Sequence, residues 1–312
     1  MVIRPLRVSV SIQTYEVDVE QPSKHEVYRD QGRTVLRLQC RALDALISDI
    51  ATAYDIAPND FDRVTIWMLQ AIGVSANSIL RLTEAVDMSI RDCFGIARSA
   101  AETAVNVSYI AAGGAELSDR AMRHLRQKRW RDLKRVAQMG DQRIVVERHL
   151  EAQVSDFPGL QDAIDEFTNR NGQEVRDWTP DNIQKRISLV GTKSKLAAEA
   201  LSGAIFTIYR PSSELLHGSF YGVNYFWRGS FERPVLGHEE FERLWTFDHF
   251  VTLLSSVFFG IRGAVEVVAL QRGLEGHRAH QAELGQLLAD LSRRMAEDEP
   301  SPDHSFTPEE RL

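Results

Sequence analysis

The stretch Ile90-RDCFGIARSAAETAVNVSY-Ile110 decides the fold, because its apolar residues recur at helical spacing on two opposite sides. A helix that is apolar on two sides is expected to be buried in a helical core. Two charged residues, Arg98 and Glu102, fall on one of the apolar stripes, four residues apart and therefore facing each other. Buried charges are costly unless they are paired and hydrogen-bonded, so this pair is either a structural strut or the wall of a polar site.

The composition restricts the class of protein. With 312 residues, 43% hydrophobic and 26% charged, the chain can bury a large core and lies in the range of soluble proteins. Its net charge of -7 argues against a protein that coats nucleic acid through bulk charge, although a local basic patch is compatible with it. Cys40 and Cys93 lie in apolar, helix-like contexts that fit a reducing compartment, and Arg4 and Arg7 interrupt any signal-peptide core. We therefore expect a cytoplasmic protein.

The stretch 250–270 is about long enough to span a bilayer. It contains Arg262 and Glu266, four residues apart and on the same side of a helix. These charges favour a buried core helix, so we expect no membrane partner.

The pattern of the whole chain predicts an all-α fold, a single large bundle of about eight to ten helices with a small N-terminal β strand or hairpin. Alternating apolar residues at 6–20 predict the β element, and residues 1–30 form an N-terminal extension. Residues 31–296 form the helical domain. The acidic, proline-bearing residues 297–312 are expected to be a disordered tail.

Capping residues and helical periodicity give the individual helices. Asn59 or Asp60, Asp87 and Ser194 are candidate N-caps, and Pro211 is expected to end one helix and start another. The segment that follows His217 is rich in glycine and aromatic residues and predicts a loop or hairpin. The predicted helices cover residues 33–54, 60–84, 90–113, 116–139, 194–209, 239–272 and 277–296, with shorter helices between 141 and 190.

The segment Tyr209-RPSSELLHG-Ser219 carries the first candidate site. Arg210 and His217 are nearly two helical turns apart and can project to the same side, and Ser213 lies four residues before the histidine. An imidazole that moves protons and an arginine that holds a phosphate are the minimum for RNA cleavage without a metal. In the alternative interpretation, His217 caps a helix and bonds to a core partner.

This spacing resembles the motif of the higher-eukaryote-and-prokaryote nucleotide-binding (HEPN) ribonucleases, in which four to six residues separate an arginine and a histidine. The resemblance implies an all-helical protein, a catalytic Arg210 and His217, and a homodimer with a composite site. It covers only eight residues, and Pro211 stands where that family has Asn, Asp or His.

The sequence supports a metal site less well than it supports metal-free RNA cleavage. Glu214 and His217 form half of a di-iron motif, but no other histidine in the chain has a glutamate three residues before it. A site for one metal ion, formed by Glu214 and His217 together with Glu102, remains an alternative. We expect no cofactor.

A basic stretch and an aromatic stretch are further candidates. Residues 120–135 carry many cations around Trp130, and could follow an RNA backbone or form a solvated face that pairs with acidic residues 297–299. The aromatic residues of 220–231, Tyr221 among them, could stack a base or pack against the core.

Three motifs in order resemble the helical domain-of-unknown-function family 5677. They are IARSAAETAVNVSYI with Arg98, Glu102 and Tyr109, then Trp178 before a helix, then IYRPSSELLHGS with Tyr209, Ser213 and His217. The resemblance covers about residues 70–270 and brings no established activity. It implies that the Arg98/Glu102 helix and the Ser213/His217 segment converge, with Glu102 holding His217 and Arg98 meeting an anion.

Two functions follow from these observations. The first is a HEPN-like, metal-independent endoribonuclease of toxin or phage-defence systems, with His217, Arg210, Glu102 and Arg98 in the catalytic site. Tyr209, Ser213, Tyr221 and Tyr109 would contact the RNA. The alternative is a non-catalytic helical scaffold or regulator with a buried Arg98/Glu102/His217 network.

Overall fold

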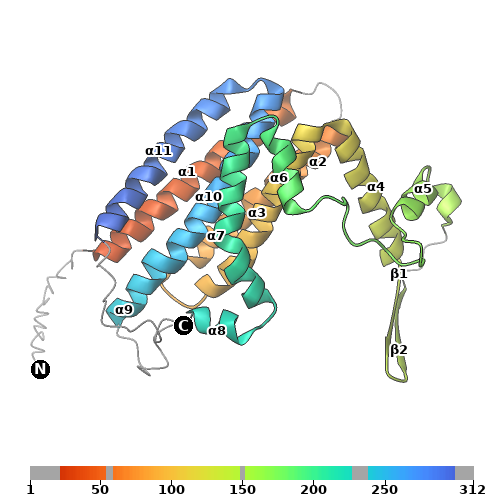
Figure 1. The fold of residues 1–312 in the computed structure, drawn as a ribbon, viewed down its shortest axis with the longest axis horizontal. Coiled ribbons are helices and arrows are strands. Elements are labelled where there is room, and N and C mark those ends of the chain that lie inside the picture. Colours follow the sequence, from red (N-terminus) through yellow and green to blue (C-terminus); the bar gives the residue numbers. More distant parts are fainter. Residues whose placement is uncertain (1–21, 54–58, 148–151, 227–237, 299–312) are drawn as a thin grey trace, which may run out of the picture.

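The computed structural model describes residues 22–53, 59–147, 152–226 and 238–298. Long helices lie side by side and form a bundle (Figure 1). Helix α3 is central, because it packs against α2, α7 and α10. The all-α class is therefore confirmed, whereas the strand predicted at 6–20 lies outside the described residues. The long helices are α1 (Lys24–Thr52), α2 (Asp60–Leu82), α3 (Ile90–Gly113), α7 (Lys195–Leu216), α10 (Val251–Arg272) and α11 (Glu275–Asp298).

Shorter elements surround or extend this bundle. Helix α4 (Ala115–Asp132) leads away from it into a hairpin of β1 (Lys134–Met139) and β2 (Gln142–Glu147), and α5 (Leu160–Glu166) lies beside α4 (Figure 1). Helix α6 (Ile183–Gly191) packs on α3 and α7. The remaining elements are a 3-10 turn (Val154–Asp156), α8 (Phe220–Phe226), α9 (His238–Arg243) and a π-helical segment (Leu244–Phe250) that continues into α10.

Both apolar sides of α3 are buried, as predicted. Phe94, Ala97 and Ala104 are fully excluded from solvent. Small residues let α10 approach closely, since a side-chain carbon at Gly260 would lie 3.6 Å from Ala104 Cβ. The small-residue face of α3 is therefore a helix-packing surface.

Two of the predicted N-cap residues, Asn59 and Ser194, are confirmed. The side chain of Asn59 accepts the backbone N–H of Asp62 at 2.9 Å, and that of Ser194 accepts the N–H of Ala197 at 3.2 Å. Helix α1 begins earlier than predicted, because Ser23 and Glu26 form a reciprocal capping box.

The hairpin replaces part of a predicted helix. The cations of 120–135 suggested a helix to 139, but the chain leaves the helix after Asp132 and pairs Val136 with Val145 and Ala137 with Ile144. Gly140 has φ +60°, which suits the first position of a tight hairpin turn. β-branched residues on both sides of this turn favour strands over helix.

Helix α7 does not end before Pro211, contrary to the prediction. It runs on to Leu216 with the proline inside it. Proline removes one backbone hydrogen bond, and the hydroxyl of Ser212 donates to the carbonyl oxygens of Ile208 (2.6 Å) and Tyr209 (3.1 Å) at this point. Arg210 therefore lies within this helix, and His217 follows its last residue as the C-cap.

The segment 220–226 was predicted as a loop or hairpin and is helix α8. The hydroxyl of Ser219 accepts the N–H of Gly222 at 3.2 Å, which caps its start. A side-chain carbon at Gly222 would lie 2.6 Å from the carbonyl oxygen of Glu214, so glycine allows α8 to lie directly on α7. Residues 227–231 of the predicted loop lie outside the described residues.

The helical stretch Phe241–Arg272 is long and apolar enough to cross a membrane, but 78% of its apolar window is buried inside the structure. Glu266 within it bonds to Arg278 of α11 at 2.9 Å and accepts the hydroxyl of Ser194 at 3.1 Å. This polar contact with two neighbouring helices fits a core helix, as predicted.

Candidate functional site

Arg98 and Glu102 face each other on α3, as the sequence predicts. Arg98 Nε donates to Glu102 Oε1 at 2.8 Å, and its guanidinium lies 4.5 Å from the ring centre of Tyr209 on α7. Their side chains are 18% and 39% exposed. The pair therefore sits at the edge of the core, where α3 meets α7.

The C-terminal half of α7 presents a polar surface. Arg210 and His217 are both exposed, and Ser213 between them is half-buried. Seven residues of continuous helix put Arg210 and His217 on the same side, about 10 Å apart along the axis. Helix α8 adds Tyr221, whose ring centre lies 5.7 Å from the Arg210 guanidinium. We call Arg210, Ser213, His217 and Tyr221 the α7–α8 face.

Glu102 does not reach His217 in the described residues. Helices α3 and α7 run antiparallel, so Gly95 lies opposite Leu216 while Arg98 meets Tyr209. His217 is therefore level with the start of α3, about two turns from Glu102. Because His217 is exposed and Glu102 bonds to Arg98, the buried Arg98/Glu102/His217 network expected for a scaffold is not formed.

Tyr109 belongs to a separate polar cluster farther along α3. Its hydroxyl donates to Asp181 at 2.6 Å, and its ring contacts Trp178 edge to face. Arg186 of α6 donates to Asn106 and to the carbonyl oxygen of Asp181, both at 2.7 Å. Tyr109 is 4% exposed, and this burial raises the pKa of its hydroxyl. The side chain is therefore engaged inside the protein rather than presented to a ligand.

Most cations of α4 have partners in the segment 166–178. Glu166 bonds to Arg120 at 2.8 Å and to Arg123 at 2.6 Å, and Glu174 bonds to Lys128 at 2.5 Å. These cations hold the pKa of both glutamates below the ordinary range. Other links in this group are Arg131 to Thr168 and Arg120 to the carbonyl oxygen of Trp178. We call these residues the α4 clasp.

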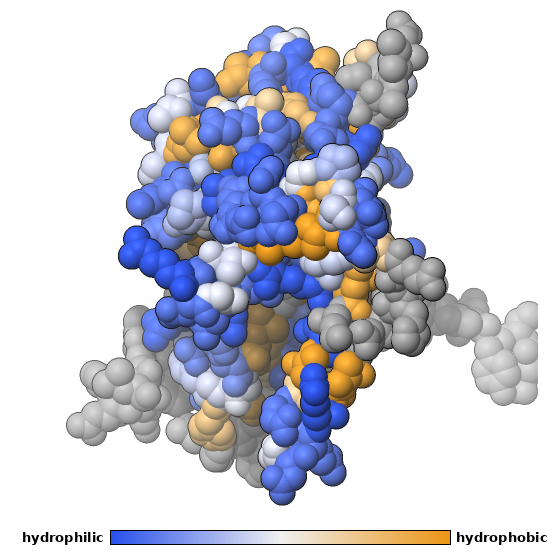
Figure 2. Space-filling view, turned by 90° about the vertical axis from the view of Figure 1, so that its right-hand side faces the viewer, coloured by the Kyte–Doolittle hydropathy of each residue, from blue (hydrophilic) through white to orange (hydrophobic). Residues whose placement is uncertain are grey.

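The clasp changes the interpretation of the basic stretch. One alternative predicted for these cations was a solvated face that pairs with residues 297–299, of which 299 lies outside the described residues. In the structure, most cations of α4 pair with residues 166–178 instead. On the side of the molecule that carries α4 and the hairpin, apolar and hydrophilic residues alternate in small groups (Figure 2). Arg126 and Arg129 stay exposed on α4, whereas the cations paired in the clasp are less available to a phosphate backbone.

The model of a family of unknown function, DUF5677, matches residues 62–233, more than half of the chain. The protein belongs to DUF5677. The predicted extent, about 70–270, was too long at its C-terminal end. Neither the curated proteins nor the solved structures compared with the chain include a significant match.

The DUF5677 region contains α2 to α8 and so includes the Arg98–Glu102 pair, the α4 clasp and the α7–α8 face. Helices α1, α10 and α11 lie outside it, although α10 packs against α3 and α7. The candidate site is therefore contained within the DUF5677 region, while part of its supporting core is not.

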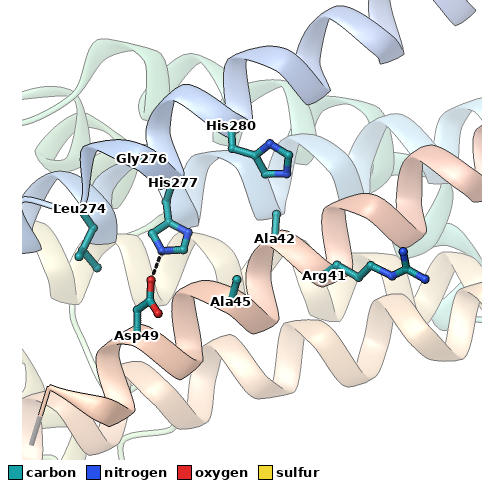
Figure 3. A pocket seen from close by; sticks show the side chains of 8 residues that line it. All are labelled: Arg41, Ala42, Ala45, Asp49, Leu274, Gly276, His277 and His280. Atoms are coloured by element: carbon teal, nitrogen blue, oxygen red, sulfur yellow. Dashed lines mark hydrogen bonds and ion pairs between the residues drawn. The ribbon is translucent and has the colours of Figure 1, made fainter.

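A hollow that the sequence did not suggest lies outside the DUF5677 region, between α1 and the start of α11. It has a volume of about 460 Å³, and Ala42 and Ala45 form its floor (Figure 3). His277 bonds to Asp49 at 2.7 Å, and His280 bonds through Nδ1 to Glu283 at 3.1 Å. Each imidazole thus has a carboxylate partner. The His-x-x-His spacing of His277 and His280 in the sequence could have indicated that these two histidines lie close together on one helix.

The described residues contain no cluster of three or more His, Cys, Asp or Glu that could hold a metal ion. In the half di-iron motif of the DUF5677 region, Glu214 accepts the hydroxyl of Ser219 at 2.6 Å. The carboxylate is therefore used to fix the turn between α7 and α8.

Proposed function

We propose that this DUF5677 protein is a HEPN-like, metal-independent endoribonuclease of toxin or phage-defence systems, and that RNA binds on the α7–α8 face. The observation that carries the proposal is the exposure of His217 on the same side of α7 as Arg210. No described residue bonds to the His217 imidazole, so it is accessible to a phosphodiester.

The reaction would use the adjacent 2'-hydroxyl of the RNA as the nucleophile. His217 takes the proton of that hydroxyl while its oxygen bonds to phosphorus, and the bond from phosphorus to the 5'-oxygen breaks. The leaving oxygen takes a proton from an imidazolium, which in a composite dimer is His217 of the second copy. Arg210 stabilises the negative charge that builds up on the phosphoryl oxygens. The products are a 2',3'-cyclic phosphate and a 5'-hydroxyl.

The aromatic residues near this pair suit single-stranded RNA. Tyr221 and Tyr209 are 43% and 42% exposed, and each has an arginine over its ring. Exposed tyrosine rings can stack bases without sequence preference. Arg98 is neutralised by Glu102, so in this scheme it positions Tyr209 rather than binding phosphate.

A second candidate function, a helical interaction protein, has its own support. Phe206, Leu216 and Phe220 are 87%, 61% and 70% exposed on α7 and α8. Large exposed apolar side chains on two adjoining helices can take part in a surface that binds another protein.

Cleavage of a mixed RNA pool in EDTA tests the first function. We expect wild type to cut and His217→Gln to lose about a hundredfold or more of the rate. His280→Gln, an exposed histidine change on α11, is the matched control and should keep full activity. End-group analysis should find cyclic phosphates.

Two results would reject the ribonuclease. One is equal cleavage by wild type and His217→Gln, and the other is no cleavage by a folded wild type. In the second case the interaction protein becomes the better proposal. Phe206→Ser should then abolish binding to the captured partner while His217→Gln leaves it unchanged.

A further inference from the structure

The β1–β2 hairpin extends from the end of α4 away from the bundle (Figure 1). All side chains of residues 135–145 are exposed. Four of them are large and apolar: Val136, Met139, Ile144 and Val145, with 44–61% of their surface exposed. An isolated two-stranded hairpin is marginally stable in water. Such an arm gains stability when its exposed residues pack on a partner.

The outer edge of β2 has free backbone groups. Met139 and Gln142 flank a two-residue turn and form its closing hydrogen-bonded pair. Hydrogen-bonded and non-hydrogen-bonded pairs alternate along antiparallel strands. The N–H and C=O groups of Arg143, Val145 and Glu147 therefore point away from β1, and no third strand pairs with them in the described residues.

The sequence of this edge is self-complementary. It reads Arg143-Ile-Val-Val-Glu147, with a cation at one end, an anion at the other and apolar residues between them. We propose that β2 pairs antiparallel with β2 of a second copy of this chain, with the two Val145 residues facing each other on the twofold axis. Because the outward backbone groups belong to alternate residues, this register also satisfies their hydrogen bonds.

The register places opposite charges together. Arg143 faces Glu147 of the second copy, and the twofold axis repeats the contact. Within each hairpin Arg143 pairs with Gln138 and Glu147 pairs with Lys134. In this backbone register, positions 138, 143, 147 and 134 follow one another across the four-stranded sheet, and the sequence has Gln, Arg, Glu and Lys at them.

The apolar residues fall into register as well. Val136 pairs with Val145 within the hairpin, so four valines form a continuous row across the sheet of two copies. Position 144 lies opposite position 146 of the second copy in the same backbone register. Cross-strand pairs of β-branched residues are a main source of sheet stability. Strand β1 has no such symmetry, because both of its cations are at one end.

A charge-swap cycle in the full-length protein tests this interface by analytical ultracentrifugation. Arg143→Glu and Glu147→Arg each set two like-charge pairs across the axis, so each should weaken the dimer about tenfold or more. The double variant restores opposite charges across the axis, but the Glu147→Arg change also meets Lys134 within each hairpin. It should therefore dimerise more tightly than either single variant and less tightly than wild type. Arg135→Glu, on β1 and away from the axis, is the matched control and should not change the dimer.

A cysteine pair tests the register independently. Val145→Cys should form an intermolecular disulfide on mild oxidation, because facing residues lie about 5.5 Å apart between Cα atoms. Gln138→Cys should not, since three strand spacings separate it from its copy. The native Cys40 and Cys93 are buried and do not compete.

A wild type that stays monomeric at every concentration would overturn the proposal. So would a dimer that ignores both single charge reversals, or equal cross-linking of the two cysteine variants. None of these measurements uses RNA cleavage. A dimer that ignores the charge reversals would overturn the β2 interface and leave the ribonuclease proposal standing, whereas a monomeric wild type would also remove the second His217 from the cleavage scheme. Circular dichroism of each variant checks that the helices are intact.

Discussion

The α4 clasp and the α7–α8 face both carry arginines, yet they differ in how those charges are satisfied. In the clasp, Glu166 alone accepts from two arginines at 2.6 and 2.8 Å. On the face, Arg210 lies over a tyrosine ring, and no described residue bonds to the His217 imidazole. A run of cations is therefore a weak indicator of a binding site, whereas exposed polar groups without protein partners indicate one better.

The largest expected effect is on the clasp. Glu166→Ala removes a half-buried carboxylate from Arg120 and Arg123, and should lower the free energy of unfolding by about 2 kcal/mol in urea denaturation. Arg129→Ala, an exposed cation change on the same helix, should cost less than about 0.5 kcal/mol. Equal losses would mean that the clasp contributes no more than a surface charge.

The clasp should also show in the pH dependence of stability. Its cations lower the folded-state pKa of Glu166 and Glu174 below the ordinary value of 4.5. Their contribution is therefore present above about pH 4.5 and is lost as the pH falls through the lowered folded-state pKa values. Melting temperatures of wild type and Glu166→Gln should converge in that acidic range. A constant difference down to the lowest pH would contradict this origin.

An intermediate effect is expected where α3 meets α7. Arg98→Met keeps the side-chain length but removes the bond to Glu102 and the contact with Tyr209, and should cost about 1 kcal/mol of unfolding free energy. A double-mutant cycle with Glu102→Gln should find coupling between the two residues. Additive losses would show that the pair is geometrically close but energetically independent.

The smallest effect on stability is expected on the α7–α8 face itself. His217→Gln and Arg210→Gln should each change the unfolding free energy by less than about 0.5 kcal/mol, because both side chains are exposed. If these variants lose RNA cleavage but keep their stability, the charges of the α7–α8 face serve function and those of the α4 clasp serve structure. A large loss of stability in His217→Gln would instead mean that His217 has a structural role, as the residues of the α4 clasp do.

Periodicity was enough to predict the helical core and the facing of Arg98 and Glu102, because both depend on spacing along one helix. It was not enough at Pro211, where the hydroxyl of Ser212 bonds to two carbonyl oxygens within a continuous helix. The hairpin was missed because its cations continue the charge pattern of α4, and α8 because its packing depends on one close contact at Gly222.

The candidate site shows the same limit. The convergence of α3 and α7 was expected from the order of the motifs, and Arg98 does meet Tyr209. The partner of Glu102 depended on the antiparallel alignment of the two helices, which spacing along the sequence does not determine. The Asp49–His277 contact joins the first and the last described helices, so no local pattern could have indicated it.

The clasp closes around the hairpin: the chain leaves α4, forms β1 and β2, and returns to α4 through residues 166–178. The hairpin therefore lies in a segment whose two flanks, α4 and residues 166–174, are joined by ion pairs. Its length and sequence can change without moving any helix of the bundle. If β2 pairs as proposed, exchanging this arm for another sequence would change the assembly of the protein while the α7–α8 face stays as it is.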